Sequence, residues 1–477
     1  MACAIARDLR KKAGLDMAKQ LHRNDLSYVE AMAISVAIMA PTAAMALNGS
    51  LAASIAGTAV PLTFLLAMIT IGLVSYAFIQ FNRNLSSSGS VYAFTGASLG
   101  PKMGFLSGFT LLLTYLTFTA ASAAEVGAFM QSFLGFLGVQ AGWFPIAVVA
   151  ALIIWLLAFF DIRIGARVML IFEGVSIVLI LILTFVILSR GGATGHLSAL
   201  PFTLHGTTMP AVGLAGVFAF LSFAGFEGAS SLGEETRDPK RAIPIAIGAA
   251  VFLTGLFYIV VSYAQTVGFG LDKSGVQSFA SSTAPLGDLA HRYMSTSFAA
   301  AIMFGAAMSA FSSALGTAAT GSRLLYSMGR DGFISKRIGQ VHERFRSPHI
   351  ALAIVMIVAL IQVFALMQQI GTNVFGYLGT IGVLALLLAY LVTNIGGIAY
   401  FLRKGTLKGA LLSVPILAIA ALAYTLYSNI YPVPGAPYNY FPYIVAMWIV
   451  IGVVIVLASP DLVRSIAAGL TREHDTE

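Results

Sequence analysis

The chain alternates between long runs of apolar residues and short polar connections. A helix needs about 20 apolar residues to cross a hydrocarbon core about 30 Å thick. Twelve stretches of suitable length occur, at 28–55, 59–81, 103–134, 142–160, 167–189, 209–232, 243–269, 294–328, 348–369, 373–402, 409–428 and 439–459. The pattern predicts an all-α integral membrane protein with 12 transmembrane helices.

The composition supports lipid as the solvent for most of the chain. Of its 477 residues, 58% are hydrophobic and only 10% are charged, whereas a soluble protein of this length needs far more polar surface. Membrane lipid is therefore an expected partner.

The net charge of +8 reports topology rather than nucleic-acid binding. If the N-terminus is cytoplasmic and the spans alternate, only Arg190, Lys273 and Arg292 of the 27 Lys and Arg residues lie outside. Basic residues accumulate on the cytoplasmic side of membrane proteins. We therefore expect a multi-pass protein of the cell (plasma or inner) membrane with both termini cytoplasmic, and no nucleic-acid partner.

The residues that enzymes and metal sites need are sparse. Cys3 is the single cysteine, which excludes a disulfide framework and a Cys-based metal site. The seven histidines are scattered without metal-ligand spacing, and no Walker or dinucleotide motif occurs. We expect no catalytic residues, no metal and no cofactor, and an ATP-driven pump is excluded.

Two of the predicted spans are interrupted at corresponding places. Span 1 is broken near Met39-Ala40-Pro41-Thr42, and span 6 near Phe223-Ala224-Gly225-Phe226. Because five spans separate them, the two broken helices run in opposite directions. Paired, inverted interruptions are the best sequence indication of a transporter site at the bilayer midplane.

Broken helices suit the binding of a zwitterion. Proline removes a backbone donor, and freed backbone groups are tolerated in a membrane only where protein, water or substrate satisfies them. Half-helix N-termini present amides to an anion such as a carboxylate. Unwound carbonyls accept hydrogen bonds from an ammonium or hold Na⁺.

Three motifs carry a family resemblance. FAGFEGASSLGEETRDPKRAIPIAI, SSSGSVYAFTGASLGPKMGFLSG (86–108) and SALGTAATGSRLLYSMGRDGFIS (313–335) resemble segments of the amino acid–polyamine–organocation (APC) superfamily. The resemblance implies a five-plus-five inverted repeat, the leucine-transporter-like fold, with ten core helices, two peripheral ones and discontinuous helices 1 and 6. It also implies secondary transport of an amino acid, polyamine or related amine by alternating access.

The same resemblance divides the chain. We expect a cytoplasmic tail at 1–26, a first repeat at 27–190 (spans 1–5) and a second at 208–403 (spans 6–10). Peripheral spans 11 and 12 occupy 408–460, and a second cytoplasmic tail occupies 461–477.

The family's substrate site falls on the two interruptions. In span 1 it comprises Ala40, Pro41, Thr42, Ala43 and Ala44, and in span 6 Phe220, Leu221, Phe223, Ala224, Gly225 and Phe226. Residues 40–42 depart from the family, because relatives often carry Gly-Ser/Thr-Gly there and proline offers no amide.

The expected roles follow from this placement. The amides of residues 42–44 and the Thr42 hydroxyl are candidate donors to a carboxylate, and the carbonyls of 220, 221 and 223 would face an amine. Gly225 would let the chain turn, and Phe226 would act as an aromatic gate. The alternative for the three phenylalanines is lipid or core packing.

A carboxylate within a span is costly and needs a reason, and two such residues are candidates for coupling or substrate contact. Glu173 in span 5 stands where proton-coupled relatives often carry lysine, and is the candidate for coupling H⁺ to substrate. The alternative is pairing with Arg163 or Arg167. Glu125 in span 3 is a candidate substrate contact that would favour a cation or amine, or else a hydrogen-bonding partner for a neighbouring helix.

Further candidates support the site. Glu227 is expected to hold the unwound region or an inner gate, and Glu234 and Glu235 belong to an inner network of opposite charges. Ser309, Ser312 and Ser313 in span 8 are a possible Na⁺ site, although small residues in membrane helices also serve close packing.

The predicted function is that of a permease for amino acids or related amines, with a small-molecule substrate and H⁺ as the coupling ion. The alternatives of the same fold are a polyamine or organic-amine exchanger and a Na⁺-coupled symporter. From other classes, a channel or receptor stays open, although a continuous polar pore lining is missing from the spans. The oligomeric state is not indicated by the sequence.

Overall fold

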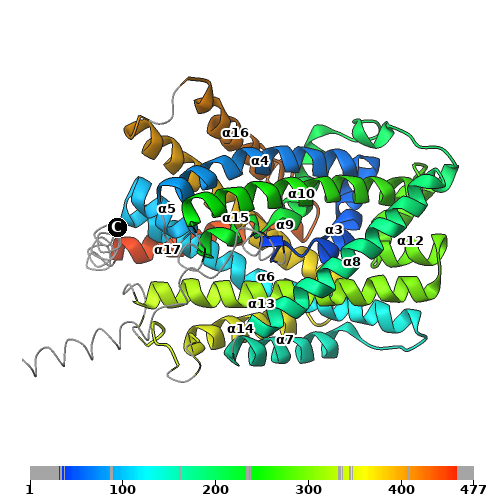
Figure 1. The fold of residues 1–477 in the computed structure, drawn as a ribbon, viewed down its shortest axis with the longest axis horizontal. Helices are drawn as coiled ribbons and strands as arrows, with labels where there is room; N and C mark the ends of the chain where they lie inside the picture. The colour runs from blue at the N-terminus through cyan, green and yellow to red at the C-terminus, as the bar shows by residue number, and fades with distance from the viewer. Residues whose placement is uncertain are drawn as a thin grey trace, which may run out of the picture.

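The computed structural model describes residues 32, 35, 36, 38–85, 90–160, 163–232, 236, 238–330, 335, 337–342, 345, 347–405 and 409–458. For residues 90, 163–169, 231, 232 and 410 it describes the backbone alone. The elements in this part of the chain are α-helices and short 3₁₀ helices, and most of the long helices run in similar directions, with α8 crossing others diagonally (Figure 1).

The first half contains these elements: α3 (Pro41–Ala56), η1 (Gly57–Ala59), α4 (Val60–Asn84), α5 (Ser90–Leu99), α6 (Pro101–Phe136), α7 (Trp143–Phe160), α8 (Arg163–Ser189), η2 (Gly192–Thr194) and η3 (Leu200–Phe202). The second half contains α9 (Met209–Phe223), η4 (Phe226–Leu232), α10 (Pro239–Phe269), α11 (Lys273–Ser281), α12 (Pro285–Tyr293), α13 (Thr296–Arg330), α14 (His349–Ala365), α15 (Gly371–Arg403), η5 (Gly409–Leu412), α16 (Ser413–Ser428), η6 (Tyr438–Tyr440) and α17 (Phe441–Ala458).

Proline marks where many of these helices begin. It occupies one of the first two positions of α3, α4, α6, α9, α10 and α12. At these positions the missing amide has no intrahelical partner to lose, and the fixed φ already suits a helix. The prolines therefore set the starts of helices whose interiors are apolar.

Nine helical stretches of the described chain are long and apolar enough to cross a membrane. One of them, Pro41–Asn84, contains both α3 and α4, joined by η1. Two shorter apolar helices, α14 and α16, overlap the predicted stretches 348–369 and 409–428. The prediction of an all-α membrane protein is confirmed, while the count of 12 spans stays a prediction.

The centre of the bundle is formed by helices from both halves of the chain. α6 packs most extensively against α13 and α15, α4 packs against α10, and α3 packs against α9. Nearly every residue of α3 is buried. Alanine, glycine and serine are frequent in α3 and α13, and small residues let membrane helices approach closely.

The periphery is apolar. α8 and α17 expose large side chains that include Phe185, Tyr443 and Leu457. Hydrocarbon can solvate such side chains, whereas a water-exposed surface of this kind would be unfavourable. These helices therefore form part of the lipid-facing surface.

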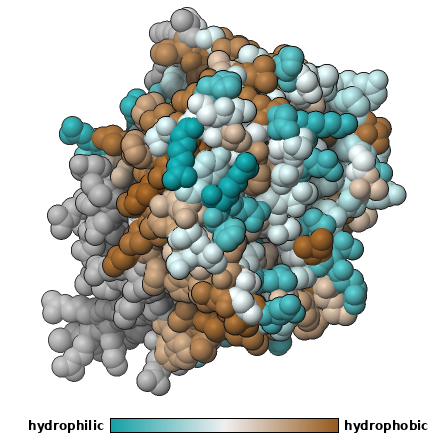
Figure 2. Space-filling model, turned by 90° about the vertical axis from the view of Figure 1, so that its right-hand side faces the viewer, coloured by the Kyte–Doolittle hydropathy of each residue, from teal (hydrophilic) through white to brown (hydrophobic). Residues whose placement is uncertain are grey.

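One end of the bundle carries the two short helices α11 and α12. The Asp272 carboxylate caps α11 by accepting hydrogen bonds from Ser274 and from the Gly275 amide, and these bonds lower the pKa of Asp272. Figure 2 shows this end, where polar side chains gather across the centre and right and apolar ones at the left and lower edges. The connection between α10 and α13 thus contains two helices, and α11 packs onto α3.

Candidate functional site

The chain leaves regular helical geometry at Ala40. Residues 36, 38 and 39 are helical, Ala40 adopts the left-handed conformation with φ 47° and ψ 63°, and α3 begins at Pro41. This conformation costs a non-glycine residue roughly 1–2 kcal/mol. Pro41 stands where its missing amide does no harm.

The first amides of α3 have partners on distant helices. Thr42 N donates to Glu173 Oε1 of α8 at 2.9 Å, and Ala43 N donates to Ser309 Oγ of α13 at 3.1 Å. Ala44 N donates to the carbonyl oxygen of Ala40 at 3.0 Å. The Glu173 carboxylate lies at the N-terminus of α3, which is the positive end of the helix dipole, and a negative charge is stabilised there. All three amides predicted to meet a substrate carboxylate therefore donate within the protein.

The second departure from helical geometry follows α9. Ala224 is extended, with φ −60° and ψ 128°, Gly225 has φ 102°, and η4 begins at Phe226. A φ of this value strains any L residue with a side chain. A Cβ at Gly225 would also collide with the side chain of Ile38, so glycine is required here for two reasons.

The two departures lie against each other. A Cβ at Gly228 would come within 2.6 Å of Ile38 Cδ1, so both glycines make room for the same side chain. Ala229 N donates to Ser35 Oγ at 2.9 Å. The residues before Ala40 are thus packed against and hydrogen-bonded to η4.

Further bonds hold η4 from the neighbouring helices. Asn82 Nδ2 of α4 donates to Ser230 Oγ at 2.9 Å. Tyr390 Oη of α15 donates to Glu227 Oε2 at 2.6 Å. The ring of Phe226 packs against those of Phe78 and Tyr390, with centroids 5.4 and 5.3 Å away.

A small cavity lies where the two departures meet α6, α13 and α15. Its polar lining residues are Asn48, Thr114, Tyr115, Ser122, Glu125, Glu227, Ser313 and Thr317. About 40 Å³ of it is open to the centre of a water molecule, whereas one water needs about 10–15 Å³ on that measure. The cavity therefore has room for a few waters and must expand to hold a metabolite.

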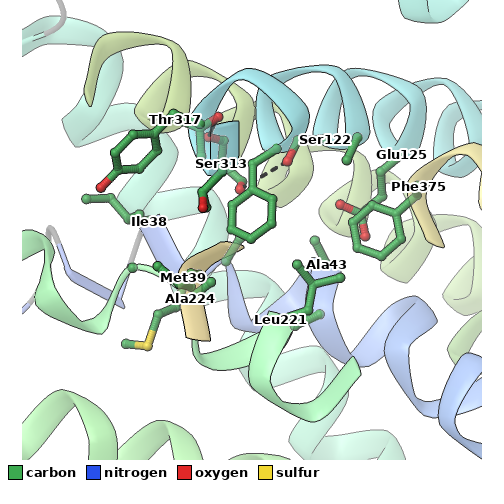
Figure 3. A pocket seen from close by; sticks show the side chains of 18 of the residues that line it. Ile38, Met39, Ala43, Ser122, Glu125, Leu221, Ala224, Ser313, Thr317 and Phe375 are labelled. Carbon is green, nitrogen blue, oxygen red and sulfur yellow. Dashed lines mark hydrogen bonds between the residues drawn. The ribbon is translucent and has the colours of Figure 1, made fainter. Parts of the chain in front are cut away.

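The polar groups concentrate on one side of this cavity. Figure 3 shows Glu125, Ser122, Ser313 and Thr317 on the side of α6 and α13, opposite apolar side chains such as Leu221. The Ser122 hydroxyl donates to Ser313 Oγ at 3.2 Å.

Glu125 brings a buried carboxyl group to the lining of the cavity. Its side chain is buried, and its Oε1 has no hydrogen-bond partner within the described part of the chain. An unpartnered buried acceptor costs about 1–3 kcal/mol, so a donor that enters the cavity would relieve this cost.

Asn48 is a lining residue that sequence reasoning missed. Its Nδ2 donates to Ser222 Oγ at 2.8 Å, and its Oδ1 has no partner among the described residues. A lone amide within an apolar stretch was a usable signal, because buried polar groups in a membrane need a reason. The hydrogen bond ties α3 to α9 beside the cavity.

The structure brings together only part of the predicted set. The predicted residues that line the cavity are Ala40, Ala43, Ala44, Leu221, Ala224, Gly225, Glu125, Glu227 and Ser313. Those outside the lining are Pro41, Thr42, Phe220, Phe223, Phe226, Glu173, Ser309 and Ser312.

The structure describes only some of the remaining candidate residues. Glu234, Glu235 and the side chains of Arg163 and Arg167 lie outside the described residues. Ser309 contacts the α3 amide and Ser313 lines the cavity, while Ser312 is half-buried. The part of the chain that the structure describes holds no group of three or more His, Cys, Asp or Glu residues able to bind a metal.

Comparison with known proteins identifies relatives across most of the chain. The family model described as amino acid permease matches residues 26–455. The methylthioribose transporter of Bacillus subtilis (strain 168) is 25% identical over 446 residues, which cover 90% of this chain and 92% of the relative.

Two further relatives match shorter stretches. The low-affinity putrescine importer of Escherichia coli (strain K12) is 27% identical over 64% of this chain and 67% of its own. The branched-chain amino acid permease of Bacillus subtilis (strain 168) is 27% identical over 62% of this chain and 65% of its own.

A solved structure shares the fold. The crystal structure of a mutant of the Eremococcus coleocola manganese transporter aligns with a TM-score of 0.55 at 14% identity, covering 95% of this chain and 98% of its own. These matches confirm a multi-pass membrane permease of the APC superfamily and not an enzyme. The family match spans all but the ends of the sequence, and the chain belongs to the amino acid permease family.

Proposed function

We propose that this chain is a secondary active transporter that moves an amino acid or related amine across the cell membrane by alternating access, coupled to protons. The observation that carries the proposal is the small cavity at the meeting point of two helix interruptions. Because the cavity is too small for a metabolite, substrate entry requires a conformational change. Alternating exposure of such a site is the expected mode of a secondary transporter.

The fold proposed for this activity is the five-plus-five inverted repeat. Repeat 1 covers 27–190 and repeat 2 covers 208–403, with two peripheral spans at 408–460. Span 1 would comprise α3 and the helical residues before Ala40, and span 6 would comprise α9 and η4. Twelve spans with cytoplasmic termini remain our proposal for the topology, supported by the distribution of Lys and Arg.

Glu173 is the proposed proton carrier. When ionised, its carboxylate accepts a hydrogen bond from the Thr42 amide at the N-terminus of α3. Protonation removes the negative charge that the helix dipole stabilises. The link between α8 and α3 then weakens, which couples proton binding to movement of the substrate site. Glu227, together with Glu234 and Glu235, would support the inner gate.

A second candidate is Na⁺ coupling. Ser309 is the observation in its favour, because its hydroxyl meets the α3 N-terminus directly beside Glu173. Hydroxyl and carboxylate oxygens are suitable ligands for a hard cation. Ser312 and Ser313 would be further candidates on the same helix.

The test is uptake into proteoliposomes across a panel of amino acids and amines, with and without a pH gradient and Na⁺. We expect a proton gradient to stimulate uptake of at least one compound and Glu173→Gln to abolish the stimulation. Asp288→Asn, an exposed carboxylate change outside the spans, is the matched control. Unchanged gradient-driven uptake in Glu173→Gln would contradict the coupling role, and no uptake of any amine-bearing compound would contradict the transport proposal.

A further inference from the structure

We propose that the substrate is a cationic amine, a monoamine or diamine, that has no carboxylate group. The ammonium of the substrate would donate to Glu125, and a further N–H of the substrate would donate to Asn48. The inference rests on the proposed transport function and narrows its substrate class.

The first observation is a pair of unsatisfied acceptors. Glu125 Oε1 and Asn48 Oδ1 both line the cavity, both side chains are at most 3% exposed, and neither oxygen has a partner in the described part of the chain. Such acceptors favour a ligand that donates hydrogen bonds. A charged donor on a carboxylate forms the stronger of the two bonds.

The second observation concerns the donors that a carboxylate would need. Pro41 has no amide, and the amides of Thr42 and Ala43 donate to Glu173 and Ser309. Glu173 thus occupies the helix N-terminus that would otherwise attract a substrate carboxylate. A zwitterionic substrate would have to displace a carboxylate that the protein supplies itself.

Two of the side-chain hydroxyls that line the cavity are also committed. Thr114 donates to the Gly382 carbonyl oxygen at 3.0 Å, and the Ser122 hydroxyl donates to Ser313. These groups are therefore poor donors for an incoming anion.

The third observation is the charge of the lining. Among the described residues that line the cavity, the ionisable side chains are Glu125, Glu227 and Tyr115, and none is basic. A substrate carboxylate would enter beside two acidic side chains with no basic side chain to offset its charge, and an uncompensated charge is costly in a region of low dielectric. An ammonium can instead pair with a carboxylate of the lining.

The experiment compares each amine with the amino acid that differs from it by one carboxylate. The pairs are cadaverine with lysine, putrescine with ornithine, and isobutylamine with valine, each radiolabelled and offered at equal concentration to wild-type proteoliposomes. We expect at least one amine to be taken up about tenfold or more faster than its partner, since 1.4 kcal/mol of discrimination corresponds to a factor of ten. This comparison needs no variant and so does not depend on folding of a mutant.

Two variants test the proposed roles of Glu125 and Glu173 by measuring binding. Binding is measured as the thermal stabilisation of detergent-purified protein by each compound. Glu125→Gln should weaken binding of the amine about tenfold or more. Glu173→Ala frees the Thr42 amide and removes a negative charge, so the preference for the amine over the amino acid should shrink. Asp288→Asn should change neither.

The outcomes separate the two proposals. Uptake of an amino acid without uptake of its amine, or amine binding unaffected by Glu125→Gln, would overturn the substrate class and leave the transport function standing. No uptake of any member of the three pairs or of the wider amine panel would overturn the transport function itself.

Discussion

The interruption before α3 and the one after α9 meet at the same cavity, yet different forces hold them. At the first, two backbone amides donate to side chains of other helices, Glu173 and Ser309. At the second, Gly225 takes a φ of 102° and leaves room for Ile38. The turn at the first depends on polar contacts to other helices, whereas the turn at Gly225 depends on shape, with hydrogen bonds holding η4 beyond it.

This difference predicts different behaviour. A proton can change a hydrogen bond to a carboxylate, whereas a packing contact between Gly225 and Ile38 does not respond to pH. We therefore expect protonation of Glu173 to act directly on the turn at the first interruption, because that carboxylate accepts a hydrogen bond from the Thr42 amide. The second should be the more sensitive of the two to steric change.

The largest expected effect is that of Gly225→Ala. The new Cβ meets Ile38 and the residue must keep a φ of 102°. Backbone strain costs about 1–3 kcal/mol and overpacking about as much again. The thermal stability of the detergent-purified protein should fall sharply, by far more than in any other variant below, and uptake should be lost.

Two controls define the cause. Gly72→Ala in α4 meets nothing within 4 Å and should leave stability unchanged or slightly raised. Adding Ile38→Ala to Gly225→Ala should recover the steric part of the loss alone. A Gly225→Ala protein as stable as wild type would show that shape does not hold this interruption.

The next largest effect is expected from Tyr390→Phe, which probes the polar support of the same region. The phenol donates to Glu227 at 2.6 Å in a buried site, and leaving a buried acceptor without its partner costs about 1–3 kcal/mol. We expect a clear fall in melting temperature. Tyr377→Phe is the control, because the described contacts of Tyr377 are between rings alone. Equal effects of the two changes would mean that the Glu227 contact adds no stability.

The sequence indicated where the chain departs from helical geometry but not what would meet it there. Pro41 and Gly225 interrupt apolar runs of the sequence, and each lies at a departure from helical geometry in the structure. The partners of the α3 amides are 131 and 266 residues away. No local pattern specifies a contact at that separation.

Which side chains of a helix point into the cavity was harder to predict, for a physical reason. A helix that is buried all round has no apolar stripe from which its inner face can be read, and almost all of α3 is buried. The carboxylates Glu125, Glu173 and Glu227 stood out as costly residues in a membrane. Asn48 did so less, because an amide is cheaper to bury than a charge. The role assigned to each, the inverted repeat and the count of spans stay predictions.

A smaller effect is expected from Ser309→Ala, which removes the acceptor of the Ala43 amide while leaving Glu173 in place. An unpaired buried amide costs about 1 kcal/mol or somewhat more. We expect a modest fall in melting temperature and faster hydrogen exchange at residues 42–44. Ser312→Ala is the control, because Ser312 makes no hydrogen bond in the part of the chain that the structure describes. Exchange that is equally slow in both variants would argue against polar control of the first interruption.

The smallest effect is expected from Ala40→Gly, which places at the first interruption the residue that relatives often carry there. Glycine relieves the left-handed strain at φ 47°, a gain of roughly 1 kcal/mol. It also widens the conformational freedom of the unfolded chain, which costs about 0.5–1 kcal/mol. The two terms nearly cancel, so the melting temperature and the uptake rate should stay close to wild type. A large change in either would mean that the Ala40 methyl group, which lines the cavity, itself helps to shape the site, and the contrast between a polar and a steric interruption would then fail.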